Sequence, residues 1–162
     1  MILVTLGTQD KDFSRLIKSV ENYVIKNKIK EKVVVQAGHT KYESKYLEIL
    51  DFVDMDTFSK LISECDILIT HGGVGSILTG INHGKKVIAA ARLKKYKEHT
   101  NDHQKQIIKK LVKEGYIVEL KNFNKLDDAL KKVKKLKIKK YISNTNNMIN
   151  LIESYIDKKW II

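Results

Sequence analysis

The sequence predicts an α/β fold in which helices cover both faces of a mainly parallel sheet. Short, strongly apolar segments alternate along the chain with longer segments whose apolar residues recur at helical spacing. Apolar strands without polar alternation are typical of parallel sheets that are buried on both sides. The chain has 162 residues and no proline, and no glycine-rich linker divides it, so we expect a single domain over residues 1–162.

Six segments have the composition of strands, because aliphatic and β-branched residues are concentrated in them. We expect strands at residues 2–6, 33–36, 51–53, 66–70, 87–91 and 116–118. In a parallel sheet the carboxyl ends of the strands meet at one edge, and ligands bind outside that edge. The candidate site therefore lies on the loops that follow the first, second, fourth and fifth of these strands.

Six helices are expected from apolar residues three or four positions apart. They begin and end near residues 12–24, 58–65, 74–81, 107–112, 126–133 and 143–157, so residues 119–162 form a helical C-terminal part. Asp12 is a candidate N-cap of the first helix, since its carboxylate can accept hydrogen bonds from the first turn. Gly115 is placed to end the fourth helix. The apolar end of the chain, residues 160–162, either packs on the sheet or docks on a partner, and packing is the preferred alternative.

Composition excludes several classes of protein. The single cysteine, Cys65, excludes an internal disulfide framework and a cysteine-built zinc site. No apolar stretch approaches the roughly 20 residues of a membrane-spanning helix. The first residues also lack the basic and small-residue features of a secretory signal. We therefore expect a cytoplasmic protein, and no sequence pattern for a metal site or another cofactor is present.

The net charge of +12 is distributed unevenly. Residues 1–93 carry 13 basic and 11 acidic side chains, whereas residues 94–162 carry 18 and 8. A solvated helix face explains the lysines of residues 131–140 best; anionic lipid headgroups or phosphate-bearing ligands come next, and nucleic acid last. Only two of the 31 basic residues are arginine, and the sequence contains no recognised nucleic-acid-binding motif. A lysine-rich nucleic-acid or anionic-surface binding module is the alternative function.

The most informative segment is residues 70–76, between a predicted buried strand and a predicted amphipathic helix. Three glycines, Gly72, Gly73 and Gly75, allow the backbone to approach a ligand closely. The free N–H groups of the first helical turn and the helix dipole favour an anion, and the Ser76 hydroxyl can add a donor. The spacing fits neither the dinucleotide fingerprint nor the P-loop. Because a tight turn alone explains fewer of these features, we expect phosphate binding.

A second segment, residues 92–104, makes this pattern recognisable. The two segments together resemble the donor-binding half of GT-B glycosyltransferases. More closely, the chain resembles the glycosyltransferase family 28 C-terminal domain in its free-standing small-subunit form. That form occurs in bacterial exopolysaccharide synthesis and as the catalytic subunit of the dolichol-linked N-acetylglucosaminyltransferase. Residues 4–8 and 36–38 match as well, so the resemblance covers residues 1–118 and implies a single Rossmann-like, nucleotide-sugar-binding domain.

The resemblance implies a donor site for a uridine diphosphate sugar. His71, the glycine turn and Ser76 would hold the diphosphate and stabilise its charge, with Arg92 as a further candidate. Asp102 and Gln104 match positions that hydrogen-bond the sugar in related enzymes. Related sites have a glutamate for the ribose where this chain has Thr79. The implied binding residues are Gly7, Thr8, His71, Gly72, Gly73, Gly75, Ser76, Glu98, Asp102 and Gln104.

The implied reaction is hexosyl transfer, in which an acceptor hydroxyl displaces the nucleoside diphosphate with inversion and without a metal. The donor would be a UDP derivative of N-acetylglucosamine, glucose or galactose. A complete GT-B enzyme has two such domains, whereas this chain has the length of one. The resemblance therefore implies a heterodimer with a membrane-anchored glycosyltransferase subunit that binds a lipid-linked glycan acceptor at the cytoplasmic membrane face. Nucleotide-sugar epimerases share the two-domain fold, but their chains carry both domains.

Overall fold

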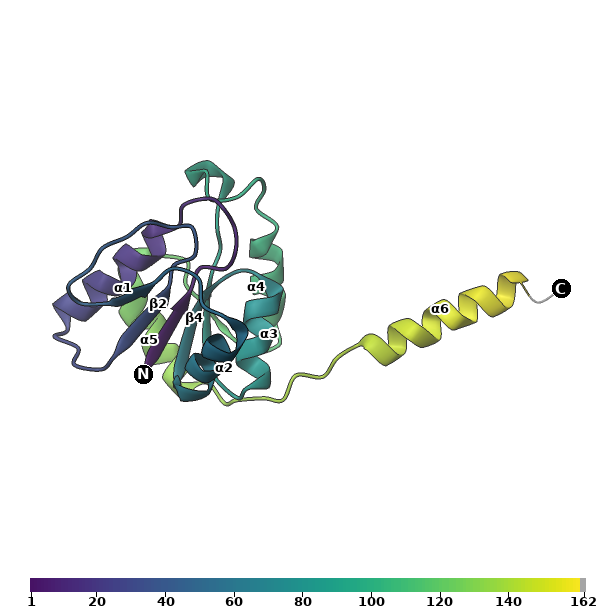
Figure 1. Cartoon of the computed structure of the whole chain (residues 1–162). Helices are drawn as coiled ribbons and strands as arrows, with labels where there is room; N and C mark the ends of the chain where they lie inside the picture. Colours follow the sequence, from purple (N-terminus) through teal and green to yellow (C-terminus); the bar gives the residue numbers. More distant parts are fainter. Residues whose placement is uncertain (161–162) are drawn as a thin grey trace.

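A computed structural model describes residues 1–160, with side chains through Asp157, and contains one fully parallel six-stranded sheet (Figure 1). The strand order is β3-β2-β1-β4-β5-β6, and every neighbouring pair runs parallel. This confirms the predicted α/β class. The strands are β1 (Ile2–Thr5), β2 (Val33–Gln36), β3 (Glu48–Leu50), β4 (Ile67–His71), β5 (Lys86–Ala90) and β6 (Val118–Glu119).

Helices cover both faces of the sheet, as the sequence predicts. The α-helices are α1 (Ser14–Lys26), α2 (Met55–Glu64), α3 (Val74–Asn82), α4 (Gln104–Lys113), α5 (Leu126–Lys135) and α6 (Thr145–Trp160), and two 3-10 turns are η1 (Lys94–Tyr96) and η2 (Phe123–Lys125). Val4 of β1 packs in a core with α1 and α5, whereas its neighbour Leu3 packs in a core with α2, α3 and α4. Side chains alternate between the two faces, so both sides of β1 are buried.

The two edges of the sheet differ from the sequence prediction. The strand expected at residues 51–53 is wrong, because β3 spans Glu48–Leu50 and Phe52 lies beyond it with 50% of its surface exposed. At this edge β3 pairs only with β2 and is half buried. Its apolar composition therefore does not show where the strand begins and ends. At the other edge β6 is only two residues long and begins two residues later than expected.

The helix ends follow the sequence signals with one adjustment. The N-cap residue of α1 is Phe13, and Asp12, the predicted N-cap, precedes it by one residue. Its carboxylate accepts hydrogen bonds from the backbone N–H of Ser14 at 3.2 Å and from the Ser14 hydroxyl at 2.8 Å. Gly115 follows α4 with a φ of +75°, the left-handed conformation that ends helices, as predicted.

The last helix, α6, does not join the layered domain. Residues 136–141 still pack on the domain, with the Tyr141 ring centroid 5.6 Å from that of Tyr116, and α6 extends beyond them as a separate arm (Figure 1). Its apolar side chains are exposed, from 46% for Ile149 to 66% for Leu151. The side chain of Trp160 and residues 161–162 lie outside the described part, as does the predicted packing of this chain end. Among the described residues, every helix is too short or too polar to cross a membrane.

Candidate functional site

The turn between β4 and α3 leaves backbone donors free at the carboxyl edge of the sheet. The N-cap residue, Gly73, has no side chain to accept hydrogen bonds from the first turn. Ile77 is the first residue of α3 whose N–H bonds back along the chain, to the carbonyl of Gly73 at 3.2 Å. A Cβ atom built on Gly75 would meet no atom within 4 Å. The N–H groups of this turn therefore face open space, where the helix dipole favours an anion.

The other glycines of the site are required by neighbouring protein atoms. A Cβ on Gly73 would collide with the imidazole of His71, and so would a Cβ on Gly7, whose φ is +74°. A Cβ on Gly72 would lie 2.7 Å from the Cβ of Gln104. Packing inside the protein therefore requires glycine at positions 72 and 73, and Gly75 is the turn glycine that faces open space.

His71 lies between the glycine turn and the first loop, which is the segment of residues 6–13 between β1 and α1. Burial, together with the nearby charge of Arg92, lowers the pKa of His71 to about 4, so its imidazole is neutral at pH 7. The hydroxyl of Thr5 lies 2.8 Å from that of Thr70, which in turn lies 3.3 Å from Nδ1 of His71. In the free protein His71 is thus a hydrogen-bonding group rather than a cation.

Arg92 fixes the first loop from the end of β5. It is 1% exposed, and its guanidinium donates hydrogen bonds to the carbonyl of Leu6 at 2.8 Å and to that of Lys11 at 2.7 Å. The guanidinium carbon lies 4.7 Å from the ring centroid of Phe13. Burial lowers the pKa of Arg92 to about 10, which leaves it charged at pH 7. Arg92 therefore positions the loop that carries Gly7, and it is not a free cation for a ligand.

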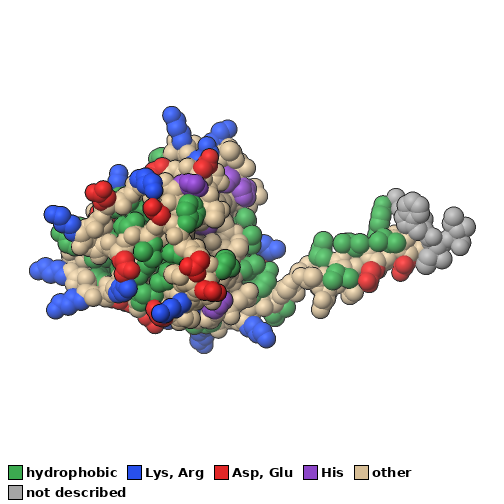
Figure 2. Space-filling model, viewed as in Figure 1, with side chains coloured by type: hydrophobic (Ala, Val, Ile, Leu, Met, Phe, Trp, Pro, Cys, Tyr) green, Lys and Arg blue, Asp and Glu red, His purple; other side chains and the backbone are tan. Residues whose placement is uncertain are grey.

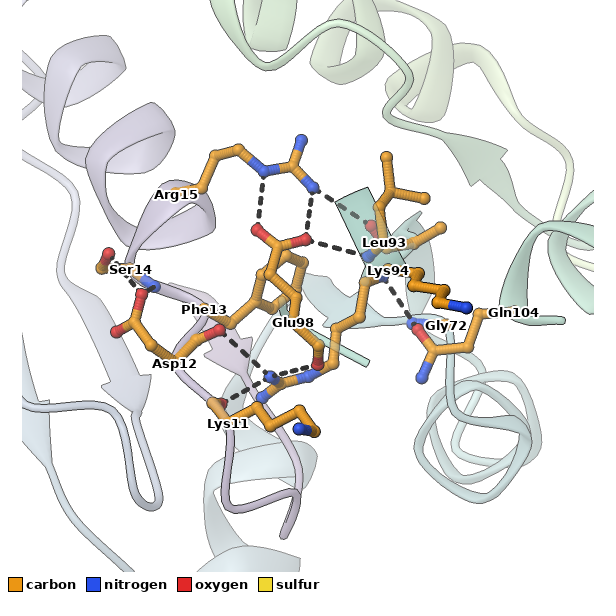
Figure 3. A network of polar contacts seen from close by, with 12 residues as sticks. Lys11, Asp12, Phe13, Ser14, Arg15, Gly72, Leu93, Lys94, Glu98 and Gln104 are labelled. Atoms are coloured by element: carbon orange, nitrogen blue, oxygen red, sulfur yellow. Dashed lines mark hydrogen bonds and ion pairs between the residues drawn. The ribbon is translucent and has the colours of Figure 1, made fainter. Parts of the chain in front are cut away.

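Glu98 is held in an ion pair that the sequence did not indicate. It is 3% exposed, and its two carboxylate oxygens accept hydrogen bonds from Arg15 Nε and a terminal Arg15 nitrogen, both at 2.8 Å (Figure 3). The N–H of Leu93 donates to the same carboxylate at 2.9 Å. The guanidinium of Arg15 lies 3.6 Å from the ring centroid of Phe123 and 4.4 Å from that of Tyr96. Glu98 therefore fixes the shape of the loop between Leu93 and α4.

Gln104 joins the two segments that the sequence singled out. Its side-chain oxygen accepts hydrogen bonds from the N–H of Gly72 at 3.1 Å and from the N–H of Arg92 at 3.0 Å. Its amide nitrogen has no hydrogen-bond partner among the described residues. Asp102, which is exposed, accepts from the N–H of Lys94 and from the ammonium of Lys105, and these hydrogen bonds lower its pKa. The structure thus brings residues 70–76 and 92–104 into one site.

The sequence matches the glycosyltransferase family 28 C-terminal domain over residues 1–157. The chain belongs to this family. The match extends past residue 118, where the resemblance seen in the sequence ends, through α5 and most of α6. None of the curated proteins matches the sequence.

Solved structures similar to this family 28 domain share its fold. The solution structure of ALG13 has a TM-score of 0.59 at 20% identity and covers 93% of each chain. MurG from Acinetobacter baumannii has a TM-score of 0.61 at 16% identity, covering 93% of this chain and 49% of MurG. The glycosyltransferase SnogD from Streptomyces nogalater has a TM-score of 0.56 at 18% identity, covering 82% of this chain and 33% of SnogD. The domain has the fold of the C-terminal half of a GT-B glycosyltransferase, and it spans a third to a half of these two longer chains.

Two further residues of this family 28 domain flank the site. Thr79 donates its hydroxyl to the carbonyl of Gly75 at 2.9 Å, one turn back in α3. Phe52, beyond β3, packs edge-to-face on His39 with ring centroids 4.9 Å apart, and it lies against Gly38 near the first loop. An exposed aromatic ring here was not expected from the sequence, because residues 51–53 read as a strand.

Proposed function

We propose that this chain is the donor-binding subunit of a UDP-sugar-dependent hexosyltransferase, using an N-acetylglucosamine, glucose or galactose donor. The observation that carries the proposal is the open turn before α3, where unpartnered N–H groups meet the free space around Gly75. Family membership supports the same interpretation. The hydrogen bonds of Gln104 support it further, since they tie this turn to the second motif of the sequence.

The turn suits the charge that develops on a leaving diphosphate. As the bond to the anomeric carbon breaks, negative charge accumulates on the diphosphate oxygens, and fixed N–H donors stabilise that state without reorganising. The N–H of Gly72 donates to Gln104 and the His71 ring lies close to Gly73, so the turn that carries the free N–H groups is fixed before the ligand arrives. The Ser76 hydroxyl adds a further donor, and the neutral His71 adds one in its Nε2–H tautomer. Transfer then gives the nucleoside diphosphate and a glycosylated acceptor.

The remaining proposed donor residues divide into two groups. Thr8 and Asp102 are exposed, and the amide nitrogen of Gln104 is unpartnered among the described residues, so these groups are available to sugar or phosphate oxygens. Gly7 and Glu98 act by positioning, through the His71 contact and the Arg15 ion pair respectively. Because both oxygens of Glu98 accept from protein donors, a direct contact with the sugar would require this ion pair to open.

We assign the acceptor half of the enzyme to a membrane-anchored partner subunit. The donor turn lies on an open edge, whereas a GT-B site is a cleft between two domains. The exposed apolar side chains of α6, among them Leu151 and Ile152, are a surface for that partner to cover. In this proposal a lipid-linked glycan is the acceptor and the chain works at the cytoplasmic membrane face.

Thermal unfolding with nucleotides tests the donor site. We expect UDP and UDP-sugars to raise the melting temperature, and ADP and GDP to leave it unchanged. A ligand at 100 times its Kd stabilises a protein by about 2.7 kcal/mol, which is easily measured. Ser76→Ala is expected to weaken UDP binding roughly tenfold, since a hydrogen bond to a charged group is lost. Ser63→Ala, a matched substitution on α2, is the control. Equal stabilisation by all three nucleotides, or by none, would contradict the proposal.

The partner is tested by activity. The purified chain is expected to bind UDP but to transfer no sugar to a lipid-linked acceptor until the partner subunit is added. Full transfer by the chain alone would contradict the partner while leaving the donor site in place.

A further inference from the structure

A second cavity opens at the carboxyl edge of the sheet, beyond the loop that carries Glu98. Its volume is about 460 Å³, and it lies beside the ends of β5 and β6. The floor is apolar and consists of Ala91, Leu93, Leu120 and Phe123. Neither the glycine turn nor the first loop lines it. The cavity therefore borders the proposed donor site through the loop of residues 92–104, but none of the proposed donor-binding residues lines it.

Four lysines line the same cavity. They are Lys95, Lys105, Lys109 and Lys121, and Glu119 is the only acidic residue among the lining side chains. Lys105 pairs with Asp102 at 2.9 Å and Lys121 with Glu119 at 3.6 Å, whereas Lys109 forms no ion pair within the described residues. When the carboxylates of Asp102 and Glu119 are counted against the four lysines, the cavity keeps an excess of two positive charges. It therefore attracts an anion.

The tip of the domain extends this basic surface. η1 and the residue after it present Lys94, Lys95 and Lys97 around Tyr96, which is 51% exposed. In Figure 1 this loop is the top of the domain, and Figure 2 shows basic side chains projecting there. The contacts of Tyr96 with Arg15, and of Arg15 with Glu98, hold the tip in place. The surface is therefore preformed.

We propose that this lysine cavity binds the phosphate of an anionic lipid headgroup, so that the domain itself contacts a membrane surface. An apolar floor beneath a ring of lysines suits a phosphate that is carried on an apolar chain. Lysines with long aliphatic stems and a half-exposed tyrosine are the side chains that favour the interface between lipid and water. This contact is independent of the partner subunit and of UDP binding.

Partitioning of the full chain into vesicles tests the proposal. The informative quantity is the ratio of binding to phosphatidylglycerol-containing and pure phosphatidylcholine vesicles, because any contribution from the exposed apolar side chains of α6 cancels in this ratio. Each lysine near an anionic bilayer is worth roughly a fivefold increase in binding. We expect Lys109→Ala/Lys121→Ala to lower the ratio roughly twentyfold. Lys131→Ala/Lys132→Ala, an equal loss of charge on exposed positions of α5, is expected to change it much less.

Several outcomes would overturn the proposal. An equal fall for both double variants would show that net charge alone drives binding. An unchanged ratio for the Lys109 and Lys121 variant would remove the cavity from membrane binding. Displacement from vesicles by inorganic phosphate, at the concentration of lipid phosphate used, would assign the cavity to a free anion. Tighter binding to a short RNA than to anionic vesicles, lost in the same variant, would assign it to nucleic acid.

Discussion

The loop after β4 and the loop after β5 are both expected from the sequence to bind the donor, but they differ in the structure. Both contain the residue types that contact phosphates and sugars, and both lie at the carboxyl edge of the sheet. The loop after β4 leaves its donors open around Gly75. The loop after β5 uses its strongest charges, Arg92 and Glu98, on its own chain. Charged residues in a binding motif are therefore not necessarily ligand contacts.

Desolvation explains this difference. Burying a charge is costly unless it is paired and hydrogen-bonded, so Arg92 and Glu98 must have protein partners. Backbone N–H groups at a helix start have no intrahelical acceptor and stay available when no side chain caps them. The proposed donor site is thus a rigid frame of buried charges around an open helix end.

The largest effect is expected from Arg92→Leu, which tests whether Arg92 is part of the frame. Removing the guanidinium leaves the backbone carbonyls of Leu6, Lys11 and Glu98 without this buried donor, and we expect a loss of about 3–5 kcal/mol in the free energy of unfolding. Urea denaturation measures it, with Lys18→Leu on the exposed face of α1 as the control. A loss below about 1 kcal/mol, the range of surface substitutions, would show that Arg92 is dispensable to the frame.

The pH dependence of stability tests the burial of His71. Its pKa is about 4 in the folded protein and about 6.5 in the unfolded chain, so between these values the unfolded chain binds more protons. Stability is therefore lost as pH falls from 6.5 towards 4, by about 3 kcal/mol from this group. His71→Gln is expected to remove this slope and His83→Gln, at the end of α3, to keep it. A wild-type slope that survives in His71→Gln would contradict the assignment.

A pair of alanine substitutions tests whether Gly73 is required for packing and whether Gly75 faces open space. Gly73→Ala is expected to destabilise the fold by about 1–3 kcal/mol, because the new methyl group meets the His71 ring. Gly75→Ala is expected to stabilise it by up to about 1 kcal/mol, since alanine favours a helix and the site is empty. Denaturation curves for both variants decide the point. Equal destabilisation would mean that Gly75 is packed like Gly73.

The sequence predicted the layers of the fold and the two motifs of the site. Apolar runs between amphipathic segments are sufficient for a parallel sheet, and glycine positions marked the turn before α3. The edge strands were misplaced because half-buried edges lack a clear apolar pattern, as at residues 51–53. The Arg15–Glu98 pair was missed because it joins residues 83 positions apart. Only packing shows that Gly73 faces His71 while Gly75 faces open space.

The most direct test of the central claim is an NMR titration of the amide groups with UDP. If the diphosphate binds at the open start of α3, the amides of Val74, Gly75 and Ser76 shift with one saturable affinity. The amides around Lys109 and Lys121 are then expected to stay in place. Saturable shifts confined to the lysine cavity, or none at residues 74–76, would contradict the account of the donor site.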